Sequence, residues 1–258
     1  MGDGPKILML CSDGPSTRAI YNALKREYGD LTVVMEGPVS RLEMARRRLK
    51  KLGYIKVAGQ IAFSGIVVPL LTRLSTRRIT QIEEEFGLRK DLDDERLTRV
   101  ESVNSPRVIS ILQALQPDVV VVNGTRIINP DVLGSTKATF INTHAGITPR
   151  YRGVHGGYWA LFEGRADLVG TTVHLVDKGI DTGGIIEQAF FKVTEHDNFV
   201  TYPYLHTAHG IPPLLRAISN TIRDGKPAIQ ESNGLESHLR YHPTIWEYLC
   251  KRIREGVK

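Results

Sequence analysis

Three residues between positions 142 and 181 have side chains that together could perform acyl transfer. Asn142 and His144 are two residues apart at the end of an expected strand, so their side chains point to the same side. Asp181 follows later, within the run G-I-D-T-G. An amide, an imidazole and a carboxylate, with no nucleophilic Ser or Cys motif, suit a reaction in which an amine is itself the nucleophile. The protein then has to stabilise an oxyanion and move protons.

The surrounding motifs resemble those of one known family. The runs N-T-H-A-G-I-T-P-R-Y-R-G-V-H (142–155) and G-T-T-V-H-L-V-D-K-G-I-D-T-G-G-I-I (170–186) are similar to the 10-formyltetrahydrofolate-dependent formyltransferases. That family includes glycinamide ribonucleotide, methionyl-tRNA and amino-sugar formyltransferases. The similarity covers roughly residues 1–38 and 100–200, and its specific part is the order and spacing of N-x-H, P-x-Y-x-G and D-T-G.

The resemblance implies a role for each of the three residues. Asn142 would donate its amide N–H to the formyl oxygen as the tetrahedral intermediate forms. His144 would polarise that oxygen or shuttle a proton. Asp181 would hold His144 in its working state and help take the proton from the attacking amine.

The resemblance also implies a binding site for 10-formyltetrahydrofolate, the formyl donor, and no metal. The segment that lines the pterin pocket is matched by Arg126, Ile127 and Ile128, and the folate-binding loop by the backbone around Val176, Asp177 and Gly179.

Two other groups of residues are candidates for binding the acceptor. Ser12, Gly14 and Ser16 lie between the first strand and a helix, where exposed N–H groups favour phosphate, although Asp13 and Pro15 depart from the family pattern. Arg152, Gly153 and His155 form the second group, and His155 could equally well begin a helix. His174 lies in an apolar strand and is interpreted as a hydrogen-bonded core residue.

These residues need a sheet to bring them together. The apolar runs Lys6–Cys11 and Asp118–Val122 predict buried parallel strands. Further strands are expected at Leu31–Met35, Thr139–Asn142, Thr171–Val176 and Ile185–Val193, and helices at Thr17–Tyr28, 106–115, 155–162, Leu205–Ile222 and Thr244–Ile253. This alternation predicts an α/β fold with a doubly wound, Rossmann-like, mostly parallel sheet, in which reactive groups collect at the carboxyl ends of strands.

The expected domain organisation is one catalytic domain over residues 1–224 and a short extension, 225–258, that ends in a helix. A helical insertion interrupts the sheet pattern at about residues 39–98, with two or three helices between Arg41 and Leu88. From Arg41 to Arg78 there are ten Lys or Arg and one acid, a net charge of +9 against +6 for the whole chain.

Three roles are open for this basic insertion. It could contact an anionic membrane surface, cover a diphosphate-bearing acceptor, or simply pack on the sheet with a solvated cationic face. Its apolar run, Val57–Leu71, is shorter than the ~20 residues that cross a bilayer. Because the basic charge is confined to one segment, no nucleic-acid partner is expected.

Composition bears on the kind of protein, on metal binding and on location in the cell. Hydrophobic residues make up 41% and charged residues 24%, which excludes a disordered or fibrous chain. Cys11 and Cys250 are far apart, and His206 and His209 lack a third ligand of clear spacing, so no metal site is expected. With no cleavable signal at the start, the predicted location is the cytoplasm.

The acceptor is expected to be a small-molecule primary amine. A nucleotide-linked amino sugar is preferred because the run Y-W-A-L-F-E-G (158–164) resembles the amino-sugar enzymes. Glycinamide ribonucleotide is the alternative, followed by a formyl-folate hydrolase and a folate-binding protein without catalysis. Methionyl-tRNA is set aside because few residues follow Gly225, and the sequence leaves the oligomeric state open.

Overall fold

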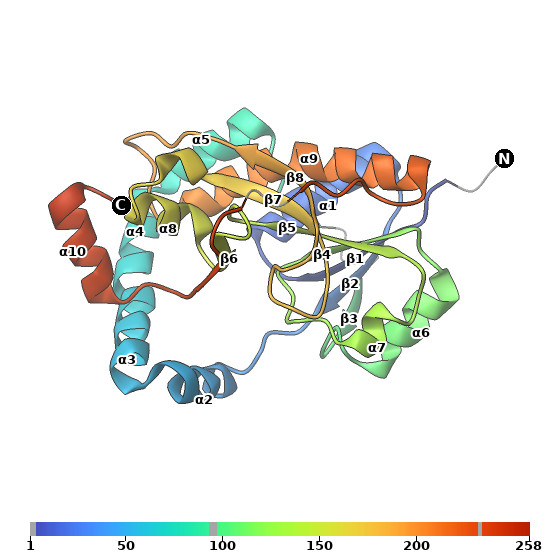
Figure 1. Cartoon of the computed structure of the whole chain (residues 1–258), viewed down its shortest axis with the longest axis horizontal. Helices are drawn as coiled ribbons and strands as arrows, with labels where there is room; N and C mark the ends of the chain where they lie inside the picture. Colours follow the sequence, from blue (N-terminus) through green and yellow to red (C-terminus); the bar gives the residue numbers. More distant parts are fainter. Residues whose placement is uncertain (1–3, 93–96, 232–233) are drawn as a thin grey trace.

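The computed structural model describes residues 4–92, 97–231 and 234–258, with all side chains in these ranges except those of 41–43, 45 and 47. A seven-stranded sheet has the order β3-β2-β1-β4-β5-β7-β8 (Figure 1). Its strands are β1 (Ile7–Ser12), β2 (Thr32–Glu36), β3 (Leu97–Val100), β4 (Val119–Asn123), β5 (Thr139–His144), β7 (Gly170–Leu175) and β8 (Ile185–Phe190). The five strands β3, β2, β1, β4 and β5 are parallel to one another. Strand β7 pairs antiparallel with β5, and β8 pairs antiparallel with β7 at the edge of the sheet. The predicted α/β fold with a mostly parallel sheet is confirmed.

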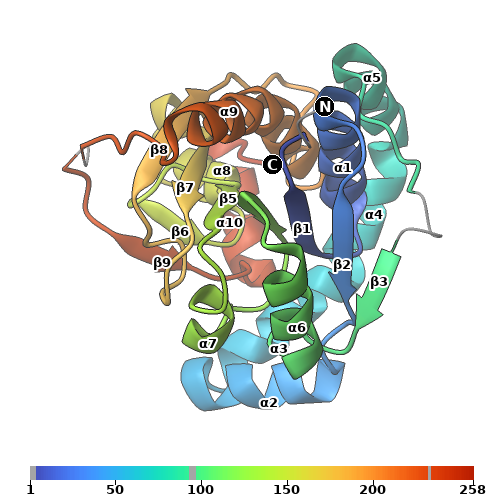
Figure 2. The same cartoon turned by 90° about the vertical axis from the view of Figure 1, so that its right-hand side faces the viewer.

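Helices cover both faces of this sheet, as the apolar strands require. Figure 2 shows α1 (Pro15–Tyr28) and α9 (Tyr202–Asp224) on one face, and α6 (Pro106–Leu115) and α7 (Pro130–Leu133) on the other. Alternate residues of each strand point to opposite faces of the sheet and so pack into two different cores. Met9 and Val121 pack with α1 and α9, whereas Leu8 and Val120 pack with α6 and α7.

A third core lies beside the sheet and includes part of the basic segment. The helices of this segment are α2 (Arg41–Leu52), α3 (Tyr54–Ala62), the π-turn η1 (Phe63–Val67), α4 (Val68–Leu74) and α5 (Thr76–Phe86). Because α3, η1 and α4 follow one another without a break, they form one long helix, and the segment has three helices, where two or three were expected. The buried side chains of η1, α4 and α5 pack with α8 (Gly156–Phe162), α9 and α10 (Ile245–Glu255).

Two expectations about this segment are wrong. The apolar run is not too short to cross a bilayer, because the helix continues for three residues at each end of it and spans the 21 residues Tyr54–Leu74. Its length and composition therefore pass the test for a membrane-crossing helix. The insertion also does not extend to residue 98, because Leu97–Val100 is strand β3 of the main sheet.

The extension after residue 224 is tied to the site by a two-stranded sheet that the sequence did not predict. In this sheet β6 (Tyr151–Gly153) pairs parallel with β9 (His238–Arg240). The expected terminal helix is α10, which begins with a capping box between Thr244 and Glu247. A short 3-10 turn, η3 (Ala166–Leu168), precedes β7.

Candidate active site

A cavity of about 500 Å³ opens at the carboxyl ends of β4 and β5. Its walls come from the ends of these strands, from the loop after β7 and from the start of α8. Among the residues that line it are eleven of those singled out from the sequence: Asn142, His144 and Asp181, then Arg126, Ile127, Ile128, Val176, Asp177, Gly179, Gly153 and His155. The structure thus brings Asn142, His144 and Asp181 together with the expected folate-binding segments around one cavity.

His144 and Asp181 form the centre of this site. The His144 Nδ1 atom lies 3.3 Å from Asp181 Oδ2, and Nε2 donates a hydrogen bond of 2.6 Å to the carbonyl oxygen of Tyr151. With its proton on Nε2, the neutral ring presents the Nδ1 lone pair to the carboxylate. A proton taken up by His144 or Asp181 would therefore lie between two acceptor atoms, His144 Nδ1 and Asp181 Oδ2.

The backbone around Asp181 holds its carboxylate in place. Asp181 has φ 51°, in the left-handed region that Asp and Asn tolerate better than most residues. The N–H of Gly153, in β6, donates a hydrogen bond of 2.8 Å to Oδ2. The turn between β5 and α8 is thereby fastened to the loop after β7.

Asn142 is oriented by His174, which the sequence assigned to the core. The two residues are opposite one another in the antiparallel pair β5–β7. His174 Nδ1 donates to the Leu175 carbonyl oxygen at 2.7 Å, so its Nε2 accepts a hydrogen bond of 3.1 Å from Asn142 Nδ2. His174 is buried, as expected, but it also lines the cavity. A buried histidine always needs hydrogen-bond partners, and here one partner is the proposed oxyanion donor.

Burial and neighbouring charges shift the pKa values of His144 and Asp181. Burial lowers the pKa of His144 below its usual 6.5, and the nearby Asp181 charge only partly opposes this. For Asp181, burial favours the neutral acid. His174, His144 and the Gly153 N–H outweigh burial and lower the pKa of Asp181 to about 2. Near pH 7 the site therefore contains a carboxylate beside a neutral imidazole.

The loop after β7 is shaped by its own hydrogen bonds. The Asp177 carboxylate accepts from the backbone N–H of Gly179 and from the hydroxyl of Thr182, at 2.9 and 2.7 Å. Any side chain at Gly183 would collide with the Leu175 carbonyl oxygen. The cavity wall predicted as the folate loop therefore has a fixed backbone, with the Asp177 side chain committed to maintaining it.

Arg126 contributes to the cavity wall while its guanidinium is bound elsewhere. Nε pairs with Glu36 at 2.8 Å, and Nη2 donates to the carbonyl oxygens of Gly37 and Glu101. Ile128 is buried beneath the wall, and Ile127 is half exposed. Arg126 thus connects β2 to the loop after β4 and does not offer a free cation.

Four sequence candidates do not line the cavity. Ser12 donates to the Gly124 carbonyl oxygen at 2.7 Å, and Ser16 accepts from Asn123 at 3.2 Å, so both support lining residues from behind. Gly14 precedes α1. Arg152 donates to the Ile180 carbonyl oxygen at 3.1 Å and holds the loop that carries Asp181.

A histidine pair marks the other end of the cavity. His155 precedes α8 with φ 58°, and its Nε2 lies 3.0 Å from Nδ1 of His242, a residue that sequence reasoning missed. Burial lowers the pKa of both rings, that of His242 to about 4, and the Arg48 charge lowers both further. The positive charge of Arg48, in the basic segment, therefore acts on the lining residue His155.

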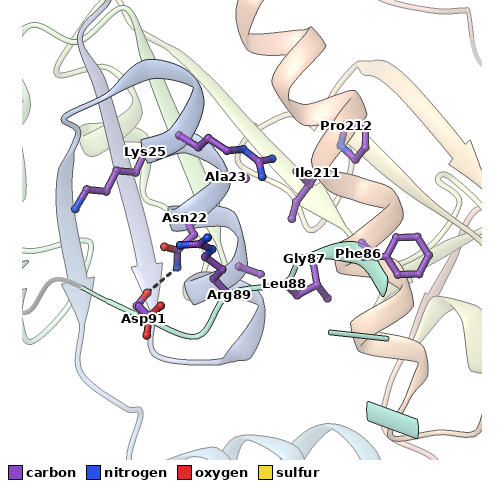
Figure 3. A pocket seen from close by; sticks show the side chains of 13 residues that line it. Asn22, Ala23, Lys25, Phe86, Gly87, Leu88, Arg89, Asp91, Ile211 and Pro212 are labelled. Atoms are coloured by element: carbon purple, nitrogen blue, oxygen red, sulfur yellow. Dashed lines mark hydrogen bonds between the residues drawn. The ribbon is translucent and has the colours of Figure 1, made fainter. Parts of the chain in front are cut away.

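A larger cavity of about 600 Å³ lies between α1, the end of α5 and α9. Figure 3 shows Asn22 donating to the backbone carbonyl oxygen of Asp91 at its wall, with Arg89 alongside. The residues that line it include no histidine and none of the sequence candidates. Size alone therefore does not identify the site, and the smaller cavity has the side chains suited to acyl transfer.

Known proteins resemble this chain in both sequence and fold. A methionyl-tRNA formyltransferase from Pelotomaculum thermopropionicum is 40% identical over 89 residues, which are 34% of this chain and 28% of that protein. The chain spans less than half the length of such curated relatives.

Two solved structures share the fold. A likely sugar N-formyltransferase from Mycobacterium tuberculosis has a TM-score of 0.58 at 17% identity, over 92% of this chain and 75% of that one. An N-formyltransferase from Helicobacter canadensis, in complex with folinic acid and dTDP-3-aminofucose, has a TM-score of 0.54 at 14% identity. This match covers 90% of this chain and 70% of that one. At such identities the likeness concerns the fold.

The family itself is given by a sequence model. The model described as formyl transferase matches residues 62–206, which are more than half of the 258 residues and include Asn142, His144 and Asp181. This chain therefore belongs to the formyl transferase family.

Proposed function

We propose that this chain transfers the formyl group of 10-formyltetrahydrofolate to a primary amine. The observation that carries this proposal is the convergence of Asn142, His144 and Asp181 on one cavity. In the reaction, the amine nitrogen forms a bond to the formyl carbon, and the bond from that carbon to the folate nitrogen breaks. The proton lost by the amine ends on the departing folate nitrogen.

Each polar residue has one task in this reaction. Asn142 donates one amide N–H to His174 Nε2 and has a second N–H for the developing oxyanion. Such a donor commonly contributes about 3 kcal/mol to transition-state stabilisation. The Asp181 carboxylate accepts the amine proton, and the lone pair on His144 Nδ1 is placed to share it.

The walls of the cavity fit a folate as the formyl donor. Apolar side chains of Val122, Ile127 and Val176 would contact a flat ring, while the fixed backbone from Val176 to Asp181 supplies polar groups. The Helicobacter canadensis neighbour, with the same fold, is in complex with folinic acid, a formylated folate.

The preferred acceptor is an amino sugar carried on a nucleotide. Its phosphates would lie near the cation of Arg48 and the donor groups around His155 and His242. The Helicobacter canadensis neighbour, in complex with dTDP-3-aminofucose, supports this choice.

A second candidate acceptor is methionyl-tRNA, because curated relatives that are 40% and 44% identical over about a third of this chain are methionyl-tRNA formyltransferases. It is also a phosphate-bearing primary amine, so the same cation would suit it.

The test is to incubate the protein with 10-formyltetrahydrofolate and a panel of amines while following release of tetrahydrofolate. The panel contains nucleotide-linked amino sugars, glycinamide ribonucleotide and methionyl-tRNA. We expect release with one acceptor class, together with a formylated product detected by mass spectrometry. Release at the same rate without an amine would indicate a hydrolase, and binding without turnover would indicate a folate-binding protein. Either result would reject the proposal.

A further inference from the structure

The long helix formed by α3, η1 and α4 has large apolar side chains on its exposed side as well as on its buried side. One side is buried: Phe63, Val67 and Leu71 pack into the third core, and Val57 is buried as well. The other side exposes large apolar side chains: Tyr54, Ile55, Ile61, Ile66, Leu70 and Leu74, with exposed fractions from 56% to 80%. A helix with two apolar sides is normally covered on both of them.

Helix α10 widens this apolar surface. It contacts α3 and lies beside it in Figure 1. The contact is close, because any side chain at Gly59 would collide with the ring of Trp246. Three of its apolar side chains are exposed: Trp246, Leu249 and Ile253. We call the six residues of the long helix and these three the docking face.

Positive charge surrounds this face. Lys50, Lys51 and Lys56 lie at its amino-terminal end, and Arg73 and Arg77 lie at the opposite end. Arg78 is paired with Asp197, so it is not counted among the cations of this face. No Asp or Glu occurs in the sequence between Glu43 and Glu83. On α10, Glu247 is used in the capping box and Glu255 pairs with Lys251. An occupant of the docking face therefore has to be apolar in its middle and anionic at both ends.

This charge pattern disfavours a second copy of the chain. Parallel pairing would bring each cationic end against its equivalent, and antiparallel pairing would bring Lys56 against Arg73 of the other copy. Both arrangements put like charges together. Crossing a bilayer is also disfavoured, because the buried side of the helix is part of the third core.

We propose that the docking face binds the surface of a membrane that contains anionic phospholipid, with the long helix lying in the interfacial plane. The exposed apolar side chains enter the boundary between headgroups and acyl chains, and the five cations contact phosphates. Tyr54 and Trp246, both exposed on this face, are residues typical of that depth.

The docking face lies directly behind the acceptor end of the cavity. Phe63, on the buried side of the long helix, packs edge to face on Phe199 with ring centroids 4.8 Å apart. Phe199 in turn packs on His155, at 4.3 Å, and His155 lines the cavity. A membrane-bound molecule of this protein would therefore keep its cavity close to the lipid surface.

Vesicle flotation tests this proposal with the full chain. Vesicles of phosphatidylcholine alone are compared with vesicles that also contain about one quarter phosphatidylglycerol. We expect the protein to float with the anionic vesicles and to be released by high salt, since exposed charges are screened. The triple variant Ile55→Ser, Ile66→Ser, Leu74→Ser should bind about tenfold or more weakly. The charge variant Lys56→Gln, Arg73→Gln should lose the preference for anionic vesicles.

A matched control is Ile229→Ser, because Ile229 is also about half exposed but lies outside the docking face. It should bind vesicles like the unmodified chain. Equal binding of the triple variant and the unmodified chain would overturn the proposal, as would equal binding to both kinds of vesicle. Light scattering supplies another refuting outcome: a dimer that the triple variant separates would mean that a second copy covers the face. None of these results depends on formyl transfer.

Discussion

Asn142 and His174 face each other across two antiparallel strands, with the amide nitrogen 3.1 Å from the imidazole Nε2. This hydrogen bond fixes which end of the amide points into the cavity, because an imidazole nitrogen without a proton accepts only a donor. The amide oxygen is then turned elsewhere, and a second N–H remains for an oxyanion.

Replacement of Asn142 by Ala should lower kcat by about two to three orders of magnitude, because one oxyanion donor is lost. Binding of the folate should weaken much less, since the amide acts mainly on the transition state. Steady-state kinetics and equilibrium binding of a folate analogue measure the two effects. As a control, Asn22→Ala removes an amide at the larger cavity and should leave the rate unchanged. Rates within tenfold of the unmodified chain would contradict the role of Asn142.

His174→Phe should reduce kcat about fivefold, because the amide of Asn142 loses the partner that orients it and one hydrogen bond contributes about 1 kcal/mol. The KM for the folate should change little. His174→Gln, which retains an acceptor, should recover part of the rate. If Phe and Gln lower kcat equally and both raise KM, His174 would be a packing residue only.

Asp181→Asn should abolish most turnover while preserving the fold. Asn tolerates the φ of 51° and still accepts from the Gly153 N–H, but it has no charge with which to take a proton. We expect a loss of about two to four orders of magnitude in kcat. Circular dichroism of the variant should match that of the unmodified chain. Turnover at a normal rate would show that another group accepts the proton.

The acid limb of the pH–rate profile should lie below pH 6.5. Burial lowers the pKa of His144, so the ring stays neutral and able to share a proton at pH values where a free imidazole is already charged. Activity should fall as pH drops through this lowered pKa. An acid limb centred above pH 7 would contradict the assignment.

Stability should depend on pH through Asp181. Its pKa is about 2 in the folded chain, below that of an unfolded Asp, so the stabilisation is complete above about pH 4 and is lost as pH falls toward 2. The free energy involved is about 2 kcal/mol. Urea unfolding between pH 5 and pH 3 should show about half of this loss, because the rest occurs only as pH falls toward 2. Asp181→Asn should flatten this dependence, and an equally steep dependence in the variant would assign it to other groups.

Phe63→Ala should destabilise the fold by about 3–5 kcal/mol, because the ring is fully buried between Phe199 and Tyr248. Ile66→Ser, on the exposed side of the same helix, should change the free energy of unfolding by less than about 0.5 kcal/mol. Denaturant titration of both variants tests the division of this helix into a buried and an exposed side. Similar losses in both would contradict that division.

The sequence alone predicted the class of fold and the polar residues that the structure brings to one cavity. The apolar runs around Met9 and Val121 predicted buried strands, because they are short and almost entirely hydrophobic. Asn142, His144 and Asp181 were found from their chemistry and order along the chain. Local patterns of this kind need no knowledge of distant contacts.

Tertiary structure decided what lies across from each residue. Only the β5–β7 register shows that His174 holds Asn142, and only the packing at Glu36 shows that Arg126 has no free guanidinium. Strand β3 was missed because it is a short strand at the edge of the sheet. The 21-residue helix was underestimated because its length depends on packing against the third core. Contacts between residues distant in sequence leave no local pattern, so these features could not be predicted from it.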